Sequence, residues 1–220
     1  MAELIRGLEV TRVRENLAQI RAEIASACAR AGRDPAAVEL LAAVKYVALE
    51  ELGTLADAGV TLAGENRAQD LVAKARAFGD RMAFDFIGHL QSRKVREIVP
   101  HVRLIHSVAS ESVLAQLERH GTPETEVLIE VNLAGEGSKS GIAPAELDAF
   151  LARCPVRVSG LMTMPPLAAT AENSRAWFAA LAQLAADRGL PRLSMGTTQD
   201  FAVAVEEGAT IVRIGSRLLR

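Results

Sequence analysis

The chain has 220 residues, half of them hydrophobic, a length that suits one domain with a large core, so we expect residues 1–220 to form a single domain. The formal net charge is −2 with acidic and basic residues interspersed, which argues against a nucleic-acid partner because no basic surface is available to displace counterions. No apolar run approaches the roughly 18 residues that cross a bilayer, no leader-like segment opens the chain, and the two cysteines lie in no metal-ligand spacing, so we expect a cytoplasmic protein with no metal site.

An amphipathic helix is predicted at residues 8–30, where apolar side chains recur every three or four positions until Ala31-Gly32. After Asp34-Pro35 the pattern changes to a short and nearly continuous apolar run at residues 38–44. Such a run is typical of a parallel strand buried on both faces, and a helical pattern follows it directly. The chain therefore begins with one extra helix before its first strand.

Short apolar runs and helical patterns alternate along the rest of the chain. The further strand candidates are residues 61–63, 84–87, 104–105, 127–131, 156–158, 192–193 and 210–214, with helical patterns at residues 67–78, 110–119, 144–152, 172–187 and 198–206. Because each strand returns through a crossover, the sheet must be parallel, and eight such units predict a closed (β/α)8 TIM barrel of the α/β class. An open doubly wound sheet is the alternative, but the first strand has no GxGxxG after it.

Polar residues or glycines follow nearly every predicted strand, and a barrel of this kind takes its ligand contacts from these positions. Lys45 follows the first strand, where we expect it to point into the barrel mouth. Burial would make its amine lose a proton more readily and act as a nucleophile toward carbonyls. The alternative is a lysine that reaches solvent just beyond the strand.

A phosphate site is predicted after the last two strands. Residues 194–198 lead into a helix and Gly215-Ser216 follows the eighth strand, so glycines, hydroxyls and unpaired amides would meet there. Barrels place phosphates between these two loops. Taken alone, Thr197 or Thr198 is typical of a helix N-cap. An amine on the first strand that faces such a cradle suits an aldehyde carrying a phosphate.

Eight stretches, in the same order over almost the whole chain, carry a resemblance to a known family. They are Ala43-Val44-Lys45-Tyr46-Val47, Gly64-Glu65-Asn66, Phe86-Ile87-Gly88-His89-Leu90-Gln91, Ile105-His106-Ser107-Val108, Glu130-Val131-Asn132 with Ser138-Lys139-Ser140-Gly141-Ile142, Gly160-Leu161-Met162, Leu193-Ser194-Met195-Gly196 and Val212-Arg213-Ile214-Gly215. Together they resemble the YggS/PROSC family of pyridoxal phosphate homeostasis proteins.

The resemblance implies a fold-type III barrel, like the N-terminal domain of alanine racemase, with pyridoxal 5′-phosphate held as a Schiff base on Lys45. It also implies that Ser194, Gly215 and Ser216 help to hold the phosphate and that Arg213 faces the pyridine nitrogen. An arginine keeps that nitrogen unprotonated, so carbanion chemistry should be weak.

The chain departs from the common family pattern at three places. Thr197-Thr198 replaces the usual Met-Ser, Ser216 replaces a threonine, and the C-terminal tail is shortened to residues 217–220. The hydroxyls at positions 198 and 216 remain, so phosphate binding should survive, whereas the pattern after the last strand does not by itself predict how a final helix would pack.

The expected cofactor contacts are Lys45, Asn66, Asn132, Met162, Ser194, Gly196, Thr198, Arg213, Gly215 and Ser216. Asn66 suits a cofactor contact or a helix N-cap, and Met162 suits packing against the cofactor or in the barrel core. The loop at residues 138–141 suits a second, transient phosphate site or a solvated loop. His89 and His106 have no evident carboxylate partner in the sequence, so no role is assigned to them.

Three functions remain open from the residues. The favoured one is a monomeric carrier that stores pyridoxal phosphate, limits its free aldehyde, passes it to apoenzymes and has no strong catalytic activity. A racemase or other amino-acid enzyme with the same cofactor is the alternative, although no residues are left for the second domain of the related racemases. A lyase without a cofactor, in which Lys45 attacks the substrate carbonyl, is the third.

Overall fold

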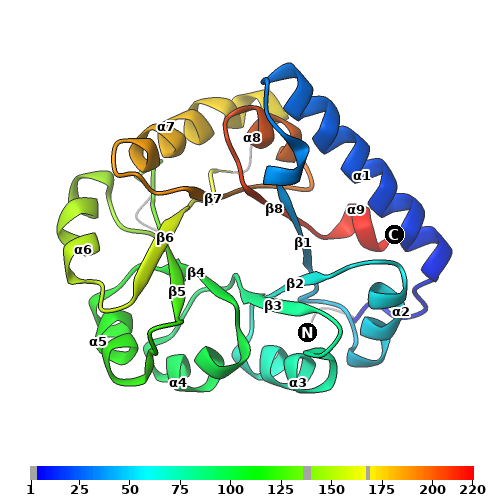
Figure 1. Ribbon diagram of the computed structural model, residues 1–220, viewed down its shortest axis with the longest axis horizontal. Helices are drawn as coiled ribbons and strands as arrows, with labels where there is room; N and C mark the ends of the chain where they lie inside the picture. Colours follow the sequence, from blue (N-terminus) through cyan, green and yellow to red (C-terminus); the bar gives the residue numbers. More distant parts are fainter. Residues whose placement is uncertain (1–3, 136–139, 167–168) are drawn as a thin grey trace.

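Eight parallel strands close into a barrel in the order of the chain, from β1 to β8, in the computed structural model, which describes residues 4–135, 140–166 and 169–220 (Figure 1). The strands are β1 (Glu39–Ala43), β2 (Leu62–Glu65), β3 (Ala83–Phe86), β4 (Leu104–Val108), β5 (Glu126–Glu130), β6 (Arg157–Met162), β7 (Arg192–Thr197) and β8 (Ile211–Ile214). Because β1 pairs with β8 as well as with β2, the prediction of a closed barrel is confirmed and the open sheet is wrong.

Helices surround the barrel and cover the outer faces of the strands (Figure 1). They are α1 (Val10–Arg30), α2 (Leu52–Asp57), α3 (Ala68–Phe78), α4 (Val95–Ile98), α5 (Glu111–His120), α6 (Leu147–Arg153), α7 (Arg175–Ala186), α8 (Phe201–Glu206) and α9 (Ser216–Leu219). The sequence patterns did not predict α4 and α9, which have four residues each and so show no helical period. Among the described residues, no helix is both long and apolar enough to span a bilayer.

The predicted N-terminal helix is confirmed as α1, which packs on the outside of the barrel against α8 and α9. The C-terminus lies beside it (Figure 1). The side-chain amide of Asn16 donates to the carbonyl oxygens of Leu218 at 3.2 Å and Arg220 at 2.8 Å, and Arg217 forms an ion pair with Glu23. Residues 217–220 therefore pack against the barrel, because α1 holds their backbone.

Several strands continue further than their apolar runs predicted. Glu65, His106 and Ser194 were expected to follow strands but lie within β2, β4 and β7, where all three are fully buried. Polar side chains are buried at low cost only when they are paired, and these three have partners inside the fold. The change from apolar to polar residues therefore does not mark the end of a strand here.

The barrel interior contains an aliphatic cluster and a polar cluster. The aliphatic cluster is formed by Leu41, Leu62, Leu104, Leu128, Met162 and Ile211. The polar cluster, which also lies on the strands, contains Asp85, His106, Ser194 and Arg213. The larger apolar core, between the barrel and the helices, is separate from both.

Candidate functional site

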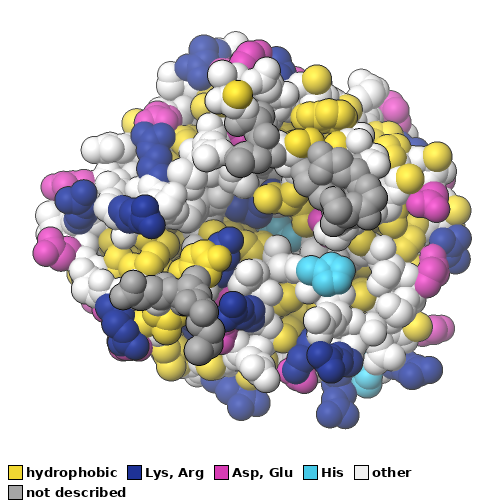
Figure 2. Space-filling view, turned by 180° about the vertical axis from the view of Figure 1, so that it is seen from behind, with side chains coloured by type: hydrophobic (Ala, Val, Ile, Leu, Met, Phe, Trp, Pro, Cys, Tyr) yellow, Lys and Arg dark blue, Asp and Glu magenta, His cyan; other side chains and the backbone are white. Residues whose placement is uncertain are grey.

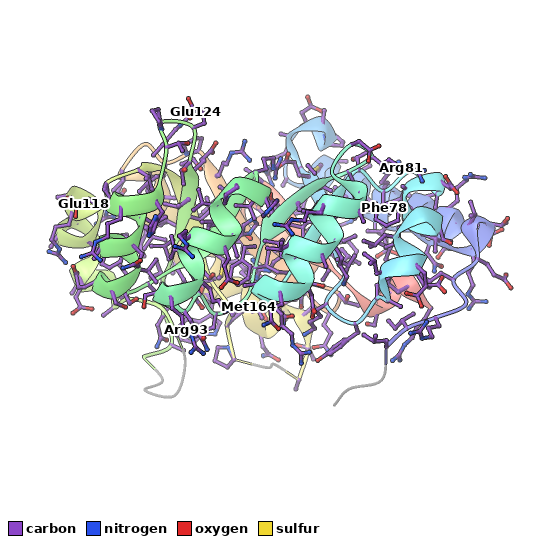
Figure 3. The ribbon with its side chains drawn as sticks, turned by 90° about the horizontal axis from the view of Figure 1, so that it is seen from below. Phe78, Arg81, Arg93, Glu118, Glu124 and Met164 are labelled. Atoms are coloured by element: carbon purple, nitrogen blue, oxygen red, sulfur yellow. The ribbon has the colours of Figure 1, made fainter. Side chains whose placement is uncertain are left out.

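A cavity of about 830 Å³ lies at the end of the barrel where the strands finish. Residues at or just beyond the ends of β3 to β7 line it, among them Gly88, Ser107, Glu130, Met162, Thr197 and Asp200. Figure 3 shows Met164 and Arg93 at this end of the molecule, with Arg81 and Glu124 at the opposite end. Seen from the cavity side, the face is hollowed near its centre, and lysine, arginine and histidine side chains are visible there (Figure 2).

Lys45 lies two residues beyond the end of β1, in a turn. Its side chain is half-buried, and its Nζ is 5.0 Å from the centroid of the Tyr46 ring. It does not line the cavity, and no carboxylate in the described part of the chain forms an ion pair with it. The amine is therefore not held in a structural salt bridge.

The backbone immediately before Lys45 is fixed by a buried lysine that the sequence analysis did not single out. Lys74, on α3, donates from Nζ to the carbonyl oxygen of Val44 at 2.7 Å and to the carboxylate of Glu65 at 2.5 Å. The second carboxylate oxygen of Glu65 accepts hydrogen bonds from the amides of Asn66 and Arg67. The sequence contained one indication of this contact, because Lys74 lies on the inward, apolar face of the helix predicted at residues 67–78.

The loops after β7 and β8 meet, as expected for the predicted phosphate cradle. The amide of Gly215 donates to Oγ1 of Thr198 at 3.2 Å, and Ser216 is the first residue of α9. The N-cap prediction for Thr197 or Thr198 is wrong, because α8 begins at Phe201 with Asp200 at its N-cap. Asp200 instead accepts hydrogen bonds from the amide and hydroxyl of Thr197.

Two glycines, Gly196 near the end of β7 and Gly215 after β8, differ in why they lack a side chain. Gly196 has φ +88°, and a Cβ there would lie 2.5 Å from Cβ of Ala204, so the close packing of β7 against α8 requires a glycine. At Gly215 a Cβ would meet only Cβ and the carbonyl oxygen of Ala43, at 3.7 and 3.8 Å, which are ordinary contacts. Gly215 therefore lies beside Ala43, two residues before Lys45, and protein packing does not demand its lack of a side chain.

Arg213, on β8, is a buried cation whose hydrogen-bond partners are neutral, while the carboxylates of Asp200 and Glu130 act on it through their charge alone. Its Nη1 donates to the carbonyl and hydroxyl oxygens of Ser194, at 2.8 and 2.5 Å. Its Nη2 donates to the carbonyl oxygen of Thr163 at 3.0 Å and contacts Sδ of Met164 at 2.8 Å. Within the described ranges Nε has no hydrogen bond and no carboxylate pairs with the guanidinium. Burial lowers the pKa of Arg213 to about 10, so it stays protonated at neutral pH.

His106 has a carboxylate partner that the sequence analysis missed. Its Nε2 lies 3.1 Å from Oδ2 of Asp85, and its Nδ1 lies 2.8 Å from Oγ of Ser194. Burial lowers the pKa of His106, and the hydrogen bond with Asp85 opposes this only in part. Burial alone would raise the pKa of Asp85, but hydrogen bonds from His106 and Arg103 outweigh it and leave the pKa below its ordinary value. The pair is therefore a neutral imidazole and a carboxylate.

The remaining expected contacts are distributed around the mouth. Asn66 is half-buried, and its Oδ1 is buried without a hydrogen-bond partner among the described residues. It does not cap α3, whose N-cap is Arg67, so that alternative is wrong. Asn132 is half-buried, and its backbone N–H donates to the carbonyl oxygen of Ile142. Met162 belongs to the aliphatic interior and also lines the cavity, so packing in the core and contact with a ligand are both open to it.

The loop at residues 138–141 lies partly outside the described residues, because Ser138 and Lys139 are not among them. Ser140 donates to Oε1 of Glu130 at 2.6 Å, and both side chains line the cavity. This part of the loop therefore contacts the mouth of the barrel.

The amino-acid sequence is similar to curated proteins over nearly its whole length. It is 38% identical over 218 residues to the pyridoxal phosphate homeostasis protein of Aquifex aeolicus, covering 93% of this chain and 96% of that protein. It is 38% identical over 216 residues to the protein of the same name from Pseudomonas aeruginosa, covering 94% of each. No family model matches the chain.

Solved structures give the same picture. The structure of PipY from Synechococcus elongatus with pyridoxal phosphate bound has a TM-score of 0.79 and 30% identity, covering 94% of this chain and all of that one. Alanine racemase from Corynebacterium glutamicum has a TM-score of 0.71 at 15% identity, covering 99% of this chain and 62% of that one. The racemase likeness concerns the fold alone, and it fits the expected fold-type III barrel.

Proposed function

The chain belongs to the family of pyridoxal phosphate homeostasis proteins, and on that premise we propose that it binds pyridoxal 5′-phosphate and takes part in the homeostasis of this cofactor. The observation that carries the proposal is the position of Gly215 beside Ala43, where β8 pairs with β1, because the glycine and hydroxyl residues after β8 then lie next to the strand that leads to Lys45. A phosphorylated aldehyde needs an amine and an anion cradle close together.

The residues at the mouth fit this cofactor in charge and in hydrogen bonding. Pyridoxal phosphate supplies an aldehyde that an amine can attack. Lys45 would hold it by condensation of Nζ with the aldehyde carbon, which forms a C=N bond and releases one water. Thr198, Gly215 and Ser216 would bind the phosphate, with Gly196 letting the β7 loop approach. Nε of Arg213 is the guanidinium donor left over for the pyridine nitrogen.

The other expected contacts take supporting roles in this proposal. The unpartnered Oδ1 of Asn66 suits a hydrogen-bond donor on the cofactor or its amine. Asn132 and Met162 are proposed to flank the ring, and Met162 is among the residues that line the cavity. Ser194 acts indirectly, since its hydroxyl is already bonded to Arg213 and His106, so the phosphate contacts are assigned to its neighbours in the two loops.

A carrier role fits this arrangement better than catalysis does. A buried arginine at the ring nitrogen leaves that nitrogen unprotonated, and an unprotonated ring is a poor electron sink. We therefore propose that the protein works as a monomer in the cytoplasm, keeps the aldehyde from free solution, and hands the cofactor to apoenzymes without strong catalytic turnover of its own.

The decisive experiment tests the covalent attachment. Wild-type protein incubated with pyridoxal phosphate should turn yellow and, after borohydride reduction, carry the cofactor on the peptide that contains Lys45. Lys45→Ala should stay colourless, whereas Lys94→Ala, which removes a surface lysine paired with Glu97, should label like the wild type. Labelling of Lys45→Ala at the wild-type level would overturn the assignment. Rapid loss of optical purity of alanine with the wild type would overturn the carrier role in favour of a racemase.

A further inference from the structure

A continuous chain of polar contacts runs through the barrel interior from the end opposite the cavity to Arg213. Glu39, at the start of β1, pairs with Arg103, which binds both carboxylate oxygens of Asp85 at 3.1 and 2.8 Å. Asp85 contacts His106, His106 contacts Ser194, and Ser194 contacts Arg213. The step from His106 on β4 to Ser194 on β7 crosses the lumen, because these strands are not neighbours in the sheet.

The contacts have a fixed direction. Asp85 is a carboxylate and accepts only, so Nε2 of His106 must carry the proton. Nδ1 of the neutral ring is then an acceptor, and the hydroxyl of Ser194 must donate its only proton to it. The oxygen lone pairs of Ser194 are left for Arg213, whose Nη1 donates to them. Each group therefore determines the orientation of the next, from Asp85 to Arg213.

The neutral partners also matter for the cost of burying the guanidinium. A buried charge is costly unless it is paired. Asp85 is separated from Arg213 by the neutral His106 and Ser194, and all three are fully buried. The carboxylates whose charge favours the protonated guanidinium are those of Asp200 and Glu130, which line the cavity. The relay therefore gives Arg213 oriented neutral acceptors rather than a hydrogen-bonded carboxylate.

Given the function proposed above, we propose that Asp85 and His106 are positioning residues, which act through Ser194 to hold Arg213 with its Nε facing the cofactor. Neither Asp85 nor His106 is among the residues that line the cavity. Their effect is to fix one hydrogen-bond direction, and with it the donor that Arg213 presents to the ring nitrogen.

Two substitutions of nearly equal size at position 106 test this. Asn offers an amide oxygen close to the position of Nδ1 and can still accept from Ser194, whereas Leu cannot. In protein without cofactor, exchange of the Arg213 Nε proton with water, followed by NMR, should speed up about tenfold in His106→Leu and stay within about twofold of the wild type in His106→Asn. In cofactor titrations, His106→Leu should weaken binding about tenfold and His106→Asn about twofold.

The NMR measurement needs no cofactor, so it distinguishes the two proposals. Failure of the wild type to bind pyridoxal phosphate would overturn the proposed function and leave the exchange rates to decide the positioning role. Equal exchange rates in His106→Leu and His106→Asn, whether fast or slow, would overturn that role. They would mean that exchange at Arg213 does not depend on a hydrogen-bond acceptor at position 106. If His106→Leu does not fold, Ser194→Ala removes the central hydroxyl with little loss of volume and should speed exchange to the same extent.

Discussion

The side-chain amine of Lys74 donates to the carbonyl oxygen of Val44 at 2.7 Å, so a helix on the outside of the barrel holds the backbone one residue before Lys45. The same amine is paired with Glu65, which is fully buried and also binds the first amides of the segment leading into α3. Strand β2, helix α3 and the turn after β1 are therefore joined at one point.

Removing this cation should destabilise the fold strongly. Lys74→Met leaves the Glu65 carboxylate buried without its partner, and loss of one member of a buried pair costs about 3–5 kcal/mol. We expect the free energy of unfolding in urea to fall by that amount. The double variant Lys74→Met with Glu65→Gln should recover a large part of it, because no charge is then left unpaired. A single variant within about 1 kcal/mol of the wild type would show that the pair is not important for stability.

Alanine substitutions at Gly196, in β7, and at Gly215, after β8, should give opposite results. Gly196→Ala forces a Cβ at positive φ against α8 and should lower the free energy of unfolding by about 1–3 kcal/mol. Gly215→Ala meets only ordinary contacts, so its stability should change by less than about 1 kcal/mol. Its affinity for pyridoxal phosphate should drop about tenfold, whereas its affinity for pyridoxal, which lacks the phosphate, should not change. An equal loss for both ligands would argue against a phosphate contact at Gly215.

Acid should destabilise the protein through His106. Its pKa in the folded protein lies below the ordinary value of 6.5, so the unfolded chain binds the proton more tightly and stability must fall as the pH falls below 6.5. The loss can reach about 1.4 kcal/mol per pH unit. Asp85 adds a second loss of the same sign below its ordinary value of 3.8, because its folded pKa is also lowered.

Urea titrations at several pH values measure this effect. His106→Asn should lose less stability than the wild type between neutral pH and mild acid, because the buried imidazole is gone. His89→Asn is the control, since the side chain of His89 is exposed and should leave the wild-type pH dependence in place. Identical pH dependence in wild type and His106→Asn would contradict the assignment of a buried, neutral His106.

The sequence was sufficient to predict the barrel because its alternation of apolar runs and helical patterns is local. All eight strand candidates correspond to strands, and the N-terminal helix begins within two residues of its predicted start. The ends of the strands were less predictable. Apolarity ends before Glu65, His106 and Ser194, although each strand continues because these side chains find partners across the barrel.

The network behind Arg213 was beyond the reach of sequence patterns. Asp85 lies inside an apolar run, and nothing close to it in the sequence indicates that it meets His106 21 residues later or that His106 meets Ser194 88 residues later. These contacts exist only because the closed barrel turns alternate residues of distant strands toward one lumen. That the segments after β7 and β8 meet was predictable, because consecutive strands of a closed barrel are neighbours, whereas the helix N-cap lies at Asp200 rather than at Thr197 or Thr198.

The hydrogen bonds from α1 to the C-terminal residues have a thermodynamic consequence. Asn16 holds the last carbonyls of α9, and α9 starts at the turn formed by Gly215 and Ser216. A molecule that binds only the docked form of this turn must, by mass action, also favour the attached form of the first helix, although it never touches that helix. A single local unfolding step would then both detach the N-terminal helix and release the bound molecule, although the molecule does not contact that helix.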